Sequence, residues 1–370
     1  MQQRVIISQD IEHDLAQAIA ETEHDRVFVL TDDITQECCL PKVAVLFAKH
    51  NATIITIRHD DTNKTLATLA DVWTALQRGG ATRHSLLVNL GGGMVTDLGG
   101  FAAATFKRGI NFINIPTTLL AMVDAAVGGK TGINFGGLKN EVGAFANARY
   151  VIVNTCFLDT LDTANLCSGY AEILKHSLIS NAQMWAEHVN FDILQPDLAE
   201  LQRMVAASIA VKEHIVADDP HEHGIRKALN FGHTIGHALE EFSMQQPGGA
   251  VVSARLLPLA RARTAPKNTL LHGYAVAFGL IGELYISARK VGFPTARLHQ
   301  TARFIRENYG AVAFTCDDYP TLLNLMRHDK KNTSDTINFT LLHDIGDIRI
   351  NQTATDEEIR EALDFIREGY

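Results

Sequence analysis

The hydrophobic residues in the first part of the chain form short β-branched runs separated by stretches with helical spacing. The runs VFVL, TIITI, LLVNL, NFINI and YVIVN occupy residues 27–30, 53–57, 86–90, 111–115 and 150–154. Between them lie stretches such as residues 66–76, where apolar positions recur every three or four residues and predict amphipathic helices. Strands that alternate with helices predict βαβ units and a parallel sheet covered by helices on both faces.

Helical patterns dominate after about Thr160, for instance at residues 197–217 and 273–291. Near the end of the chain, INFTLLHD and DIRINQTAT predict a small hairpin, and Thr355 followed by acidic residues predicts the cap of a final helix. We therefore expect an α/β nucleotide-type domain at residues 1–160 and a mainly helical domain at residues 161–370.

The segment at residues 246–268 has no clean periodicity. It combines three prolines, two adjacent glycines and a run of arginines. Such a composition is typical of an inserted surface loop.

Composition and charge exclude several classes of protein. The chain has 370 residues, 46% hydrophobic and 20% charged, which suits a globular protein of two domains. Its net charge of −9 argues against non-specific binding to nucleic acid or a membrane surface, because both require a basic face.

The five cysteines form no CxxC pair, and their odd number argues against a disulfide framework and for a reducing compartment. The N-terminus lacks a signal-peptide pattern, and the uncharged run at residues 109–123 is too short to span a membrane. We expect a cytoplasmic protein.

The string LVNLGGGMVTDLGGF at residues 87–101 places three glycines between a predicted strand and a predicted helix. Glycines there let a phosphate approach the main chain, and the helix N-terminus offers N–H groups to it. The dinucleotide fingerprint is incomplete, because Thr96 stands where GxGxxG requires glycine, and the P-loop lysine is absent. A plain tight turn is the alternative. Downstream, IPTTLLAMVDAAVGGKTGIN brings Asp124 and Lys130 into one non-periodic stretch.

A second group of residues suits a metal ion. Glu172 lies in SGYAEILKH, His233 and His237 lie four apart in LNFGHTIGHALEE, and His272 lies in LLHGYAVAFG. Histidines at i and i+4 share one face of a helix, and two or three histidines with a carboxylate suit catalytic zinc or a similar ion. Hydrogen-bonded core histidines are the alternative. Glycine precedes both His233 and His237, which we interpret as room for a ligand.

Several cationic residues stand in apolar or glycine-rich surroundings. Each alone would be a solvated surface residue, but an unpaired charge in such surroundings is costly unless an anion meets it. The group comprises Arg108, Lys130, Lys139, Lys175, Lys212, Arg226, Lys330 and Lys331.

Seven strings, taken together and in this order, resemble the 3-dehydroquinate synthase family. They are GGGMVTDLGGFAAATFKRGI, IPTTLLAMVDAAVGGKTGIN, LKNEVGAF, AEILKH, RKALNFGHTIGHALE, HGYAVAFG and HDKKN. The resemblance runs from about Asp32 to Asn332 and is far more specific than any single string. It implies a Rossmann-like N-terminal domain, a helical metal-binding C-terminal domain and a homodimer.

The resemblance also implies an activity. The family converts 3-deoxy-D-arabino-heptulosonate 7-phosphate to 3-dehydroquinate and phosphate in the shikimate pathway, using NAD and a divalent metal, zinc or cobalt. A hydroxyl of the substrate is transiently oxidised, phosphate is eliminated, the ketone is reduced again, and an aldol step closes the ring. The implied partner is thus a small phosphorylated sugar acid.

Site residues can be carried over from the family motifs one by one. The metal ligands would be Glu172, His233 and His272, so that His237 becomes a substrate contact. The contacts to NAD would be Asp32, Asp61, Lys64, Gly92, Gly93, Asp97, Thr117, Thr118, Lys130, Lys139 and Thr160. The substrate contacts would be Asp124, Lys130, Lys139, Asn140, Lys175, Lys212, Arg226, Asn230, His237 and Lys330. Arg108 resembles the family arginine that reaches the phosphate site of the neighbouring subunit.

Four features depart from the family pattern. Tyr274 replaces the glutamate of HGE, which we expect to remove a carboxylate near the metal. Asn165 stands where a carboxylate would contact the cofactor, and Asp61 replaces a longer glutamate. His233 and His272 are 39 residues apart, more than is usual, and the segment at 246–268 accounts for the extra length.

Three alternatives remain at this stage. Another sugar phosphate cyclase, making deoxy-scyllo-inosose or epi-valiolone, would share the motifs, but Lys212 with Arg226 suits a substrate carboxylate that those substrates lack. A metal-dependent polyol or glycerol dehydrogenase would share the fold. A non-catalytic protein that has kept the fold is the alternative from a different class.

Overall fold

The computed structural model describes residues 3–245, 251–252, 269–328 and 336–369. The chain forms two compact units. Unit 1 comprises Met1–Leu161 with Asp197–Ile209, and unit 2 comprises Asp162–Pro196 with Ala210–Tyr370. The units are described separately.

Unit 1 is built on a six-stranded sheet in which every neighbouring pair is parallel. The strand order is β1-β8-β5-β4-β2-β3. The strands are β1 (Arg4–Ile7), β2 (Val27–Asp32), β3 (Thr53–Ile57), β4 (Leu86–Gly91), β5 (Asn111–Pro116) and β8 (Tyr150–Val153). The predicted parallel sheet is confirmed, and β1 is a further strand that the pattern did not predict.

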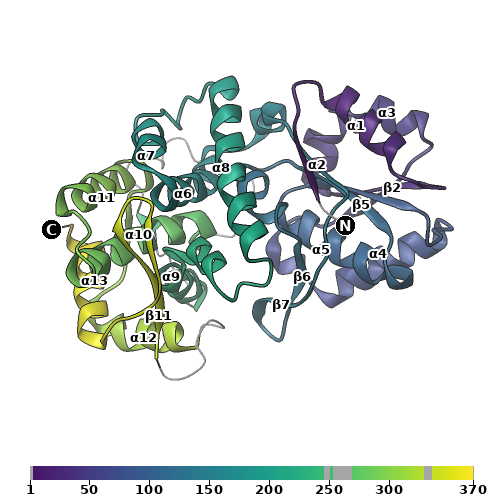
Figure 1. Ribbon diagram of the computed structural model, residues 1–370. Coiled ribbons are helices and arrows are strands. Elements are labelled where there is room, and N and C mark those ends of the chain that lie inside the picture. Colours follow the sequence, from purple (N-terminus) through teal and green to yellow (C-terminus); the bar gives the residue numbers. More distant parts are fainter. Residues whose placement is uncertain (1–2, 246–250, 253–268, 329–335, 370) are drawn as a thin grey trace. The chain divides into compact units, whose positions relative to one another are not determined.

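Helices lie on both faces of this sheet, as expected. Figure 1 shows α1 and α3 on one side and α4 and α5 on the other. Leu69, Val72 and Leu76 of α4 are fully buried, because their three- and four-residue spacing places them on one face. The helices are α1 (Ile11–Glu21), α2 (Asp33–Cys38), α3 (Ala44–Lys49), α4 (Leu66–Arg78) and α5 (Gly93–Thr105).

A two-stranded hairpin extends from unit 1 where the sequence showed only a non-periodic stretch. Its strands are β6 (Lys130–Phe135) and β7 (Leu138–Phe145), paired antiparallel. Gly136 and Gly137 make the turn with φ of 60° and 84°, which glycine adopts without strain. Most of β7 is exposed on both faces, so it lacks the alternation that predicts a half-buried strand.

Unit 2 is mainly helical, which confirms the prediction. Its helices are α6 (Thr163–Ser180), α7 (Ala182–His188), the second part of α8 (Leu198–Asp218), α9 (His233–Gln245), α10 (His272–Lys290), α11 (Thr295–Tyr309), α12 (Tyr319–Arg327) and α13 (Asp356–Glu368). The predicted hairpin is β11 (Asn338–Asp344) with β12 (Asp347–Thr353). Thr355 caps α13 and forms a capping box with Glu358, as predicted.

The first part of α8 belongs to unit 1 through a glutamine. The Gln202 side chain donates to the Ser8 carbonyl at 2.8 Å and accepts from the Thr155 hydroxyl at 2.9 Å. Residues 197–209 therefore join the sheet domain although they come late in the sequence.

Glycines let α10 pack closely against its neighbours. A Cβ on Gly279 would lie 1.9 Å from the Gly232 carbonyl oxygen, and one on Gly273 would lie 1.8 Å from that of Ser168. The interpretation that glycines before His233 and His237 make room for a ligand is therefore wrong. Gly232 has a φ of 81°, which favours glycine, and a Cβ on Gly236 would lie 3.0 Å from the Ala275 carbonyl oxygen. The first glycine is therefore explained by its backbone conformation and the second by the close approach of α10.

The segment at 246–268 lies outside the described residues except for two of them. Val251–Val252 form β9, which pairs with β10 (Ala311–Val312). Among the helices of the described residues, none has the length and apolar character that a membrane crossing requires.

Candidate active site

The carboxyl edge of the sheet in unit 1 carries the predicted cofactor motifs. Asp32 ends β2, and the Gly91–Gly93 run follows from β4 into α5. The chain leaves β2 toward β3 and leaves β4 in the opposite direction, toward β5. In parallel α/β sheets, ligands bind in the crevice where the strand order reverses in this way.

The glycine run lies close to the loop that follows β5. Gly92 is the N-cap of α5, and a Cβ on it would lie 3.0 Å from the Thr118 side chain. The Thr117 amide donates to the Gly91 carbonyl at 3.0 Å. The first turn of α5 thus begins without side chains beside the Thr117–Thr118 loop, an arrangement that suits a pyrophosphate group.

Lys64 joins two of the predicted site residues. Its ammonium lies 2.5 Å from an Asp97 carboxylate oxygen and 2.5 Å from the Asn140 side-chain oxygen, and its side chain is 3% exposed. Burial raises the pKa of Asp97, and Lys64 opposes that shift. Nearby, Lys139 lies 3.6 Å from the Asp61 carboxylate. The structure therefore brings together Asp61, Lys64, Asp97, Lys139 and Asn140.

The remaining predicted residues of unit 1 take varied positions. Asp32 caps α2 by accepting from the Thr35 amide at 2.7 Å, and burial raises the pKa of its carboxyl. Asp124 is half-buried in the short helix Ala121–Ala125, Lys130 is exposed at the start of β6, and Thr160 is exposed at the end of a short helix.

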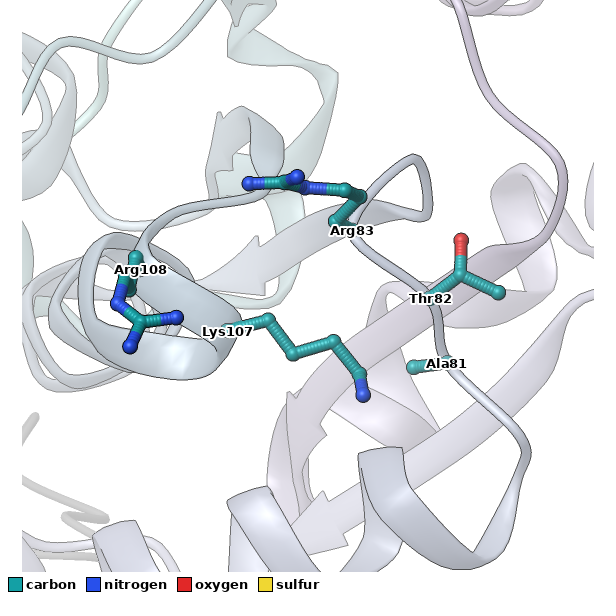
Figure 2. Close-up of a pocket in the computed structure, with 5 residues that line it drawn as sticks. All are labelled: Ala81, Thr82, Arg83, Lys107 and Arg108. Atoms are coloured by element: carbon teal, nitrogen blue, oxygen red, sulfur yellow. The ribbon is translucent and has the colours of Figure 1, made fainter.

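Arg108 lies at the other edge of the same sheet. It precedes β5, and Arg83 precedes β4, so both stand at the amino ends of strands whose carboxyl ends carry Gly91 and Pro116. Both arginines, with Lys107, Ala81 and Thr82, line an open pocket of about 370 Å³. Figure 2 shows these five residues. Arg108 is thus separated from the cofactor motifs of its own subunit.

In unit 2, the three predicted metal ligands converge. Glu172 projects from α6, His233 is the first residue of α9, and His272 is the first residue of α10. One ligand atom from each lies within 4.8 Å of the others. Glu172 Oε1 is 3.4 Å from His233 Nε2 and 3.3 Å from His272 Nε2.

These distances fit a metal ion. Ligand atoms at about 2.1 Å from a tetrahedral zinc ion are about 3.4 Å apart. The second nitrogen of each imidazole also faces an acceptor, because His233 Nδ1 is 3.1 Å from the Phe231 carbonyl and His272 Nδ1 is 2.9 Å from Glu240 Oε2. A proton on Nδ1 leaves the Nε2 lone pair for a metal, as metal-binding histidines require.

The charges around this group keep Glu172 ionised. Glu172 is fully buried and forms an ion pair with Lys175, one turn along α6. Burial opposes ionisation, but Lys175 and then His233 bring the pKa of Glu172 well below its usual value. Burial likewise opposes the charge on His272, yet Glu240 and Glu172 raise the pKa of His272 to about 10.

His237 lies beside the ligand group. Its ring centre is 5.2 Å from that of His233 and 5.9 Å from that of His272. Lys212 on α8 and Arg226 in the short helix Ile225–Asn230 are both buried, and the Arg226 guanidinium donates to the Pro220 carbonyl at 2.6 Å. Asn230 donates to Glu222 at 2.5 Å. Lys330 and Lys331 lie outside the described residues.

Two glutamates support the site without having been predicted. Glu240 contacts His272, and Glu283 of α10 accepts from the amides of Gly232 and Thr234 at 2.7 and 2.9 Å. Glu240 stands seven residues after His233, two helical turns along the same face, and this spacing was a usable signal. Glu283 interrupts the apolar run LIGELYI, which marks a buried charge.

The family departures have local explanations. Tyr274 packs its ring on Tyr309 at 5.1 Å and is 5% exposed. Tyr274 thus brings no carboxylate to this place, and the carboxylate that contacts His272 comes from Glu240. The Asn165 amide and side chain both donate to Asp162 at 2.8 Å, which caps α6.

Comparison with known proteins follows the same division of the chain. A family model described as 3-dehydroquinate synthase N-terminal matches residues 54–168, and one described as 3-dehydroquinate synthase C-terminal matches residues 169–257 and 260–332. A 3-dehydroquinate synthase from Parabacteroides distasonis is 50% identical over 369 residues, covering 100% of this chain and 99% of that protein. One from Clostridium tetani is 32% identical over 343 residues, covering 92% and 86%.

Solved structures share the fold at lower identity. A 2-deoxy-scyllo-inosose synthase, complexed with carbaglucose-6-phosphate, NAD+ and Co2+, is 22% identical with a TM-score of 0.81, covering 98% of this chain and 95% of that one. A 2-epi-5-epi-valiolone synthase from Streptomyces hygroscopicus, with NAD+ and Zn2+ bound, is 24% identical with a TM-score of 0.79, covering 99% and 97%. These likenesses confirm the predicted fold class.

Proposed function

We propose that this chain, which belongs to the 3-dehydroquinate synthase family, converts 3-deoxy-D-arabino-heptulosonate 7-phosphate to 3-dehydroquinate and phosphate. The predicted family is confirmed by the two family models and the relative that is 50% identical over the full length. The observation that carries the proposal is the convergence of Glu172, His233 and His272 at distances that fit a metal ion.

The cofactors of the proposed reaction are NAD and a divalent metal, zinc or cobalt. Glu172, His233 and His272 would hold the metal, and the carboxyl edge with Asp32, Gly92 and Gly93 would hold NAD. When bound, NAD accepts and returns a hydride, and the metal polarises substrate oxygens. The distant homologues crystallised with NAD+ and Co2+ or Zn2+ support this cofactor pair.

The cationic side chains of this chain would bind and orient an anionic substrate. In unit 2, Lys212 and Arg226 are held in buried positions, where charge-assisted hydrogen bonds to a carboxylate are stronger than in water. His237 stands beside the metal ligands, within reach of a substrate bound there. Asp124, Lys130, Lys139, Asn140, Lys175, Asn230 and Lys330 complete the proposed substrate contacts.

A homodimer would give Arg108 a role that its own subunit does not offer. Arg108 lies at the amino edge of the sheet, opposite the cofactor motifs. An arginine at that edge would meet the phosphate of a substrate bound by another subunit. We therefore propose that Arg108 serves the neighbouring active site, and a cytoplasmic location for the dimer stays a prediction.

Phosphate release tests the proposal. The purified protein, supplied with the heptulosonate phosphate, NAD and zinc or cobalt, should release inorganic phosphate, and omission of the metal or of NAD should abolish the release. Glu172→Ala should also abolish it, because this substitution removes a ligand and leaves Lys175 without its ion-pair partner. Absence of phosphate release with all components present contradicts the proposal.

The two synthases that share the fold suggest a second candidate function, that of a cyclase acting on a sugar phosphate without a carboxylate. The buried pair of cations, Lys212 and Arg226, favours an acid substrate instead. Arg226→Ala should impair turnover of the heptulosonate phosphate by raising its KM. Faster turnover of glucose 6-phosphate or sedoheptulose 7-phosphate than of the sugar acid would favour the second candidate.

A dehydrogenase and a non-catalytic protein are excluded by different measurements. A glycerol dehydrogenase from Schizosaccharomyces pombe shares the fold at a TM-score of 0.62 and 12% identity. Such an enzyme accumulates NADH during turnover, whereas the proposed reaction returns every hydride. A non-catalytic protein would show no rise in melting temperature with NAD or metal.

A further inference from the structure

We propose that Glu240 is a positioning residue for the metal site: its carboxylate fixes the ring of His272 and thereby sets the affinity for the metal. The proposal rests on the proposed function, because it presupposes that Glu172, His233 and His272 bind a metal. Glu240 itself is not among the three converging ligands.

The contact between Glu240 and His272 is direct and sheltered. Glu240 Oε2 lies 2.9 Å from His272 Nδ1, and the Glu240 side chain is 7% exposed. The other ring nitrogen, Nε2, lies 3.3 Å from Glu172 Oε1. A carboxylate on one side of the ring and the metal-ligand group on the other leave the imidazole a single useful orientation.

The two histidines differ in what holds them. His233 Nδ1 faces the carbonyl of Phe231, a neutral acceptor two residues away, at 3.1 Å. His272 Nδ1 faces a carboxylate from another helix. A charged acceptor binds the N–H more strongly and makes the ring a better donor to a metal. His272 therefore depends on a side chain that can be replaced without touching the main chain.

The placement of Glu240 on α9 links both histidines to one helix. Glu240 follows His233 by two turns, so both project from the same face of α9. Ser243, one turn further, accepts from the Leu270 amide at 3.0 Å, two residues before His272. Helix α9 thus carries one ligand, orients a second and holds the segment that leads into α10.

Electrostatics points to the same role. Lys175 adds a positive charge to the ligand group, and Glu172 is the single carboxylate among its three ligands. Glu240 brings a second negative charge within hydrogen-bond distance of one ligand. Removing it would leave a divalent ion and an ammonium facing one carboxylate, which weakens binding of the ion.

Metal affinity of three variants tests the proposal. Glu240→Ala removes the acceptor, Glu240→Gln keeps the shape and an amide acceptor but loses the charge, and Glu241→Ala alters an exposed neighbour on the same helix. The metal-free proteins are titrated with zinc in competition with a chromogenic chelator. We expect a dissociation constant roughly 10- to 100-fold higher for Glu240→Ala, a smaller rise for Glu240→Gln and no change for Glu241→Ala.

The absorption spectrum of the cobalt-loaded proteins provides a second readout. Reorientation of His272 changes the ligand field, so the visible bands of Glu240→Gln should shift while those of Glu241→Ala match the unaltered protein. Circular dichroism and an unchanged dissociation constant for NAD identify variants that have kept their fold. If Glu240→Ala does not fold, the zinc affinity and the cobalt spectrum of the isosteric Glu240→Gln test the proposal.

Each outcome bears on a different claim. Zinc affinity within twofold of the unaltered protein in a folded Glu240→Gln, with an unshifted cobalt spectrum, overturns the role of Glu240 and leaves the proposed function standing. Failure of the unaltered protein to bind zinc or cobalt contradicts the proposed function itself. Weaker binding in Glu240→Gln and normal binding in Glu241→Ala support the positioning role.

Discussion

Single residues in the metal-ligand group depend on partners outside it. Glu172 is ionised because Lys175 and the histidines offset its burial. His233 and His272 can present Nε2 together because Phe231 and Glu240 occupy their other nitrogens. The proposed role of each ligand therefore depends on a neighbouring residue that is not itself a proposed ligand.

A buried histidine outside the ligand group predicts how stability depends on pH. His188, at the end of α7, is 1% exposed, and burial lowers its pKa to about 4. The folded-state pKa is below the ordinary value of 6.5, so its contribution to stability is present above pH 6.5 and is lost as the pH falls toward 4. Between pH 6.5 and 5 the loss is about 2 kcal/mol.

Urea unfolding of the unaltered protein and of His188→Gln at both pH values isolates this contribution. The variant should lose less stability on acidification than the unaltered protein, by about 2 kcal/mol. His343→Gln, at an exposed position, is the matched control and should follow the unaltered protein. Parallel pH profiles for His188→Gln and the unaltered protein would contradict the assignment.

Residue types predicted the candidate metal ligands better than they predicted the side chains that hold those ligands in place. Residue types and spacing singled out Glu172, His233, His237 and His272, because few side chains bind divalent metals, and the family motifs then selected three of the four as ligands. Glu240 was not found, because a glutamate on a helix ordinarily faces solvent, and its contact with His272 arises only where α9 packs on α10. Glu240 follows His233 by seven residues, and this spacing indicates a shared role only once the buried face of α9 is known.

At the scale of elements, the start of α9 is held by a carboxylate from α10. Glu283 is fully buried and accepts from the amides of Gly232, Thr234 and Ile235 at 2.7, 2.9 and 3.3 Å. Amides in the first turn of a helix lack partners within the helix, and a negative charge there also complements the helix dipole. His233 is the first residue of this helix, so Glu283 positions one of the three residues that we propose as metal ligands.

Removal of this cap should cost both stability and metal binding. Glu283→Ala leaves three buried amides without their acceptor, and we expect a loss of about 3 kcal/mol in the free energy of unfolding. Glu283→Gln keeps one acceptor and should lose less. Glu357→Ala, at an exposed position on α13, is the control. Chemical denaturation measures the effect, and a loss in Glu283→Ala no greater than in Glu357→Ala would contradict it.

Elements were predictable where the hydrophobic period was strong. The five predicted strands match β2, β3, β4, β5 and β8 closely, because buried parallel strands are continuous apolar runs. The hairpin β6–β7 was missed because most of β7 is exposed and its pairing follows from the glycine turn rather than from burial. The short edge strand β1 was missed because four residues show no period.

At the scale of the whole molecule, the acidic balance of −9 conceals local basic sites. Arg83, Lys107 and Arg108 surround one cavity of unit 1, and Lys212 and Arg226 are buried in unit 2. The net charge therefore argues against non-specific binding to nucleic acid or membranes, but it does not exclude an anionic substrate bound at a local basic site. Unit 1 takes in residues 197–209 as well as the chain up to Leu161, and sequence order could not show that this later segment belongs to it.

Mixing two inactive variants tests whether Arg108 acts across a dimer. Arg108→Ala lacks the reaching arginine, and Glu172→Ala lacks a metal ligand. A mixed dimer contains one site with both groups intact, so random exchange of subunits should restore about a quarter of the unaltered activity. Activity of the mixture no higher than that of the separate variants would place Arg108 in its own subunit's chemistry or in none.

The identity of the product tests the central claim most directly. The protein is incubated with 3-deoxy-D-arabino-heptulosonate 7-phosphate, NAD and zinc, and the products are identified by NMR while the absorbance of NADH is followed. The account predicts 3-dehydroquinate and phosphate in equal amounts with no net NADH. Any other carbocycle, an oxidised open-chain sugar with accumulating NADH, or unchanged substrate would contradict it.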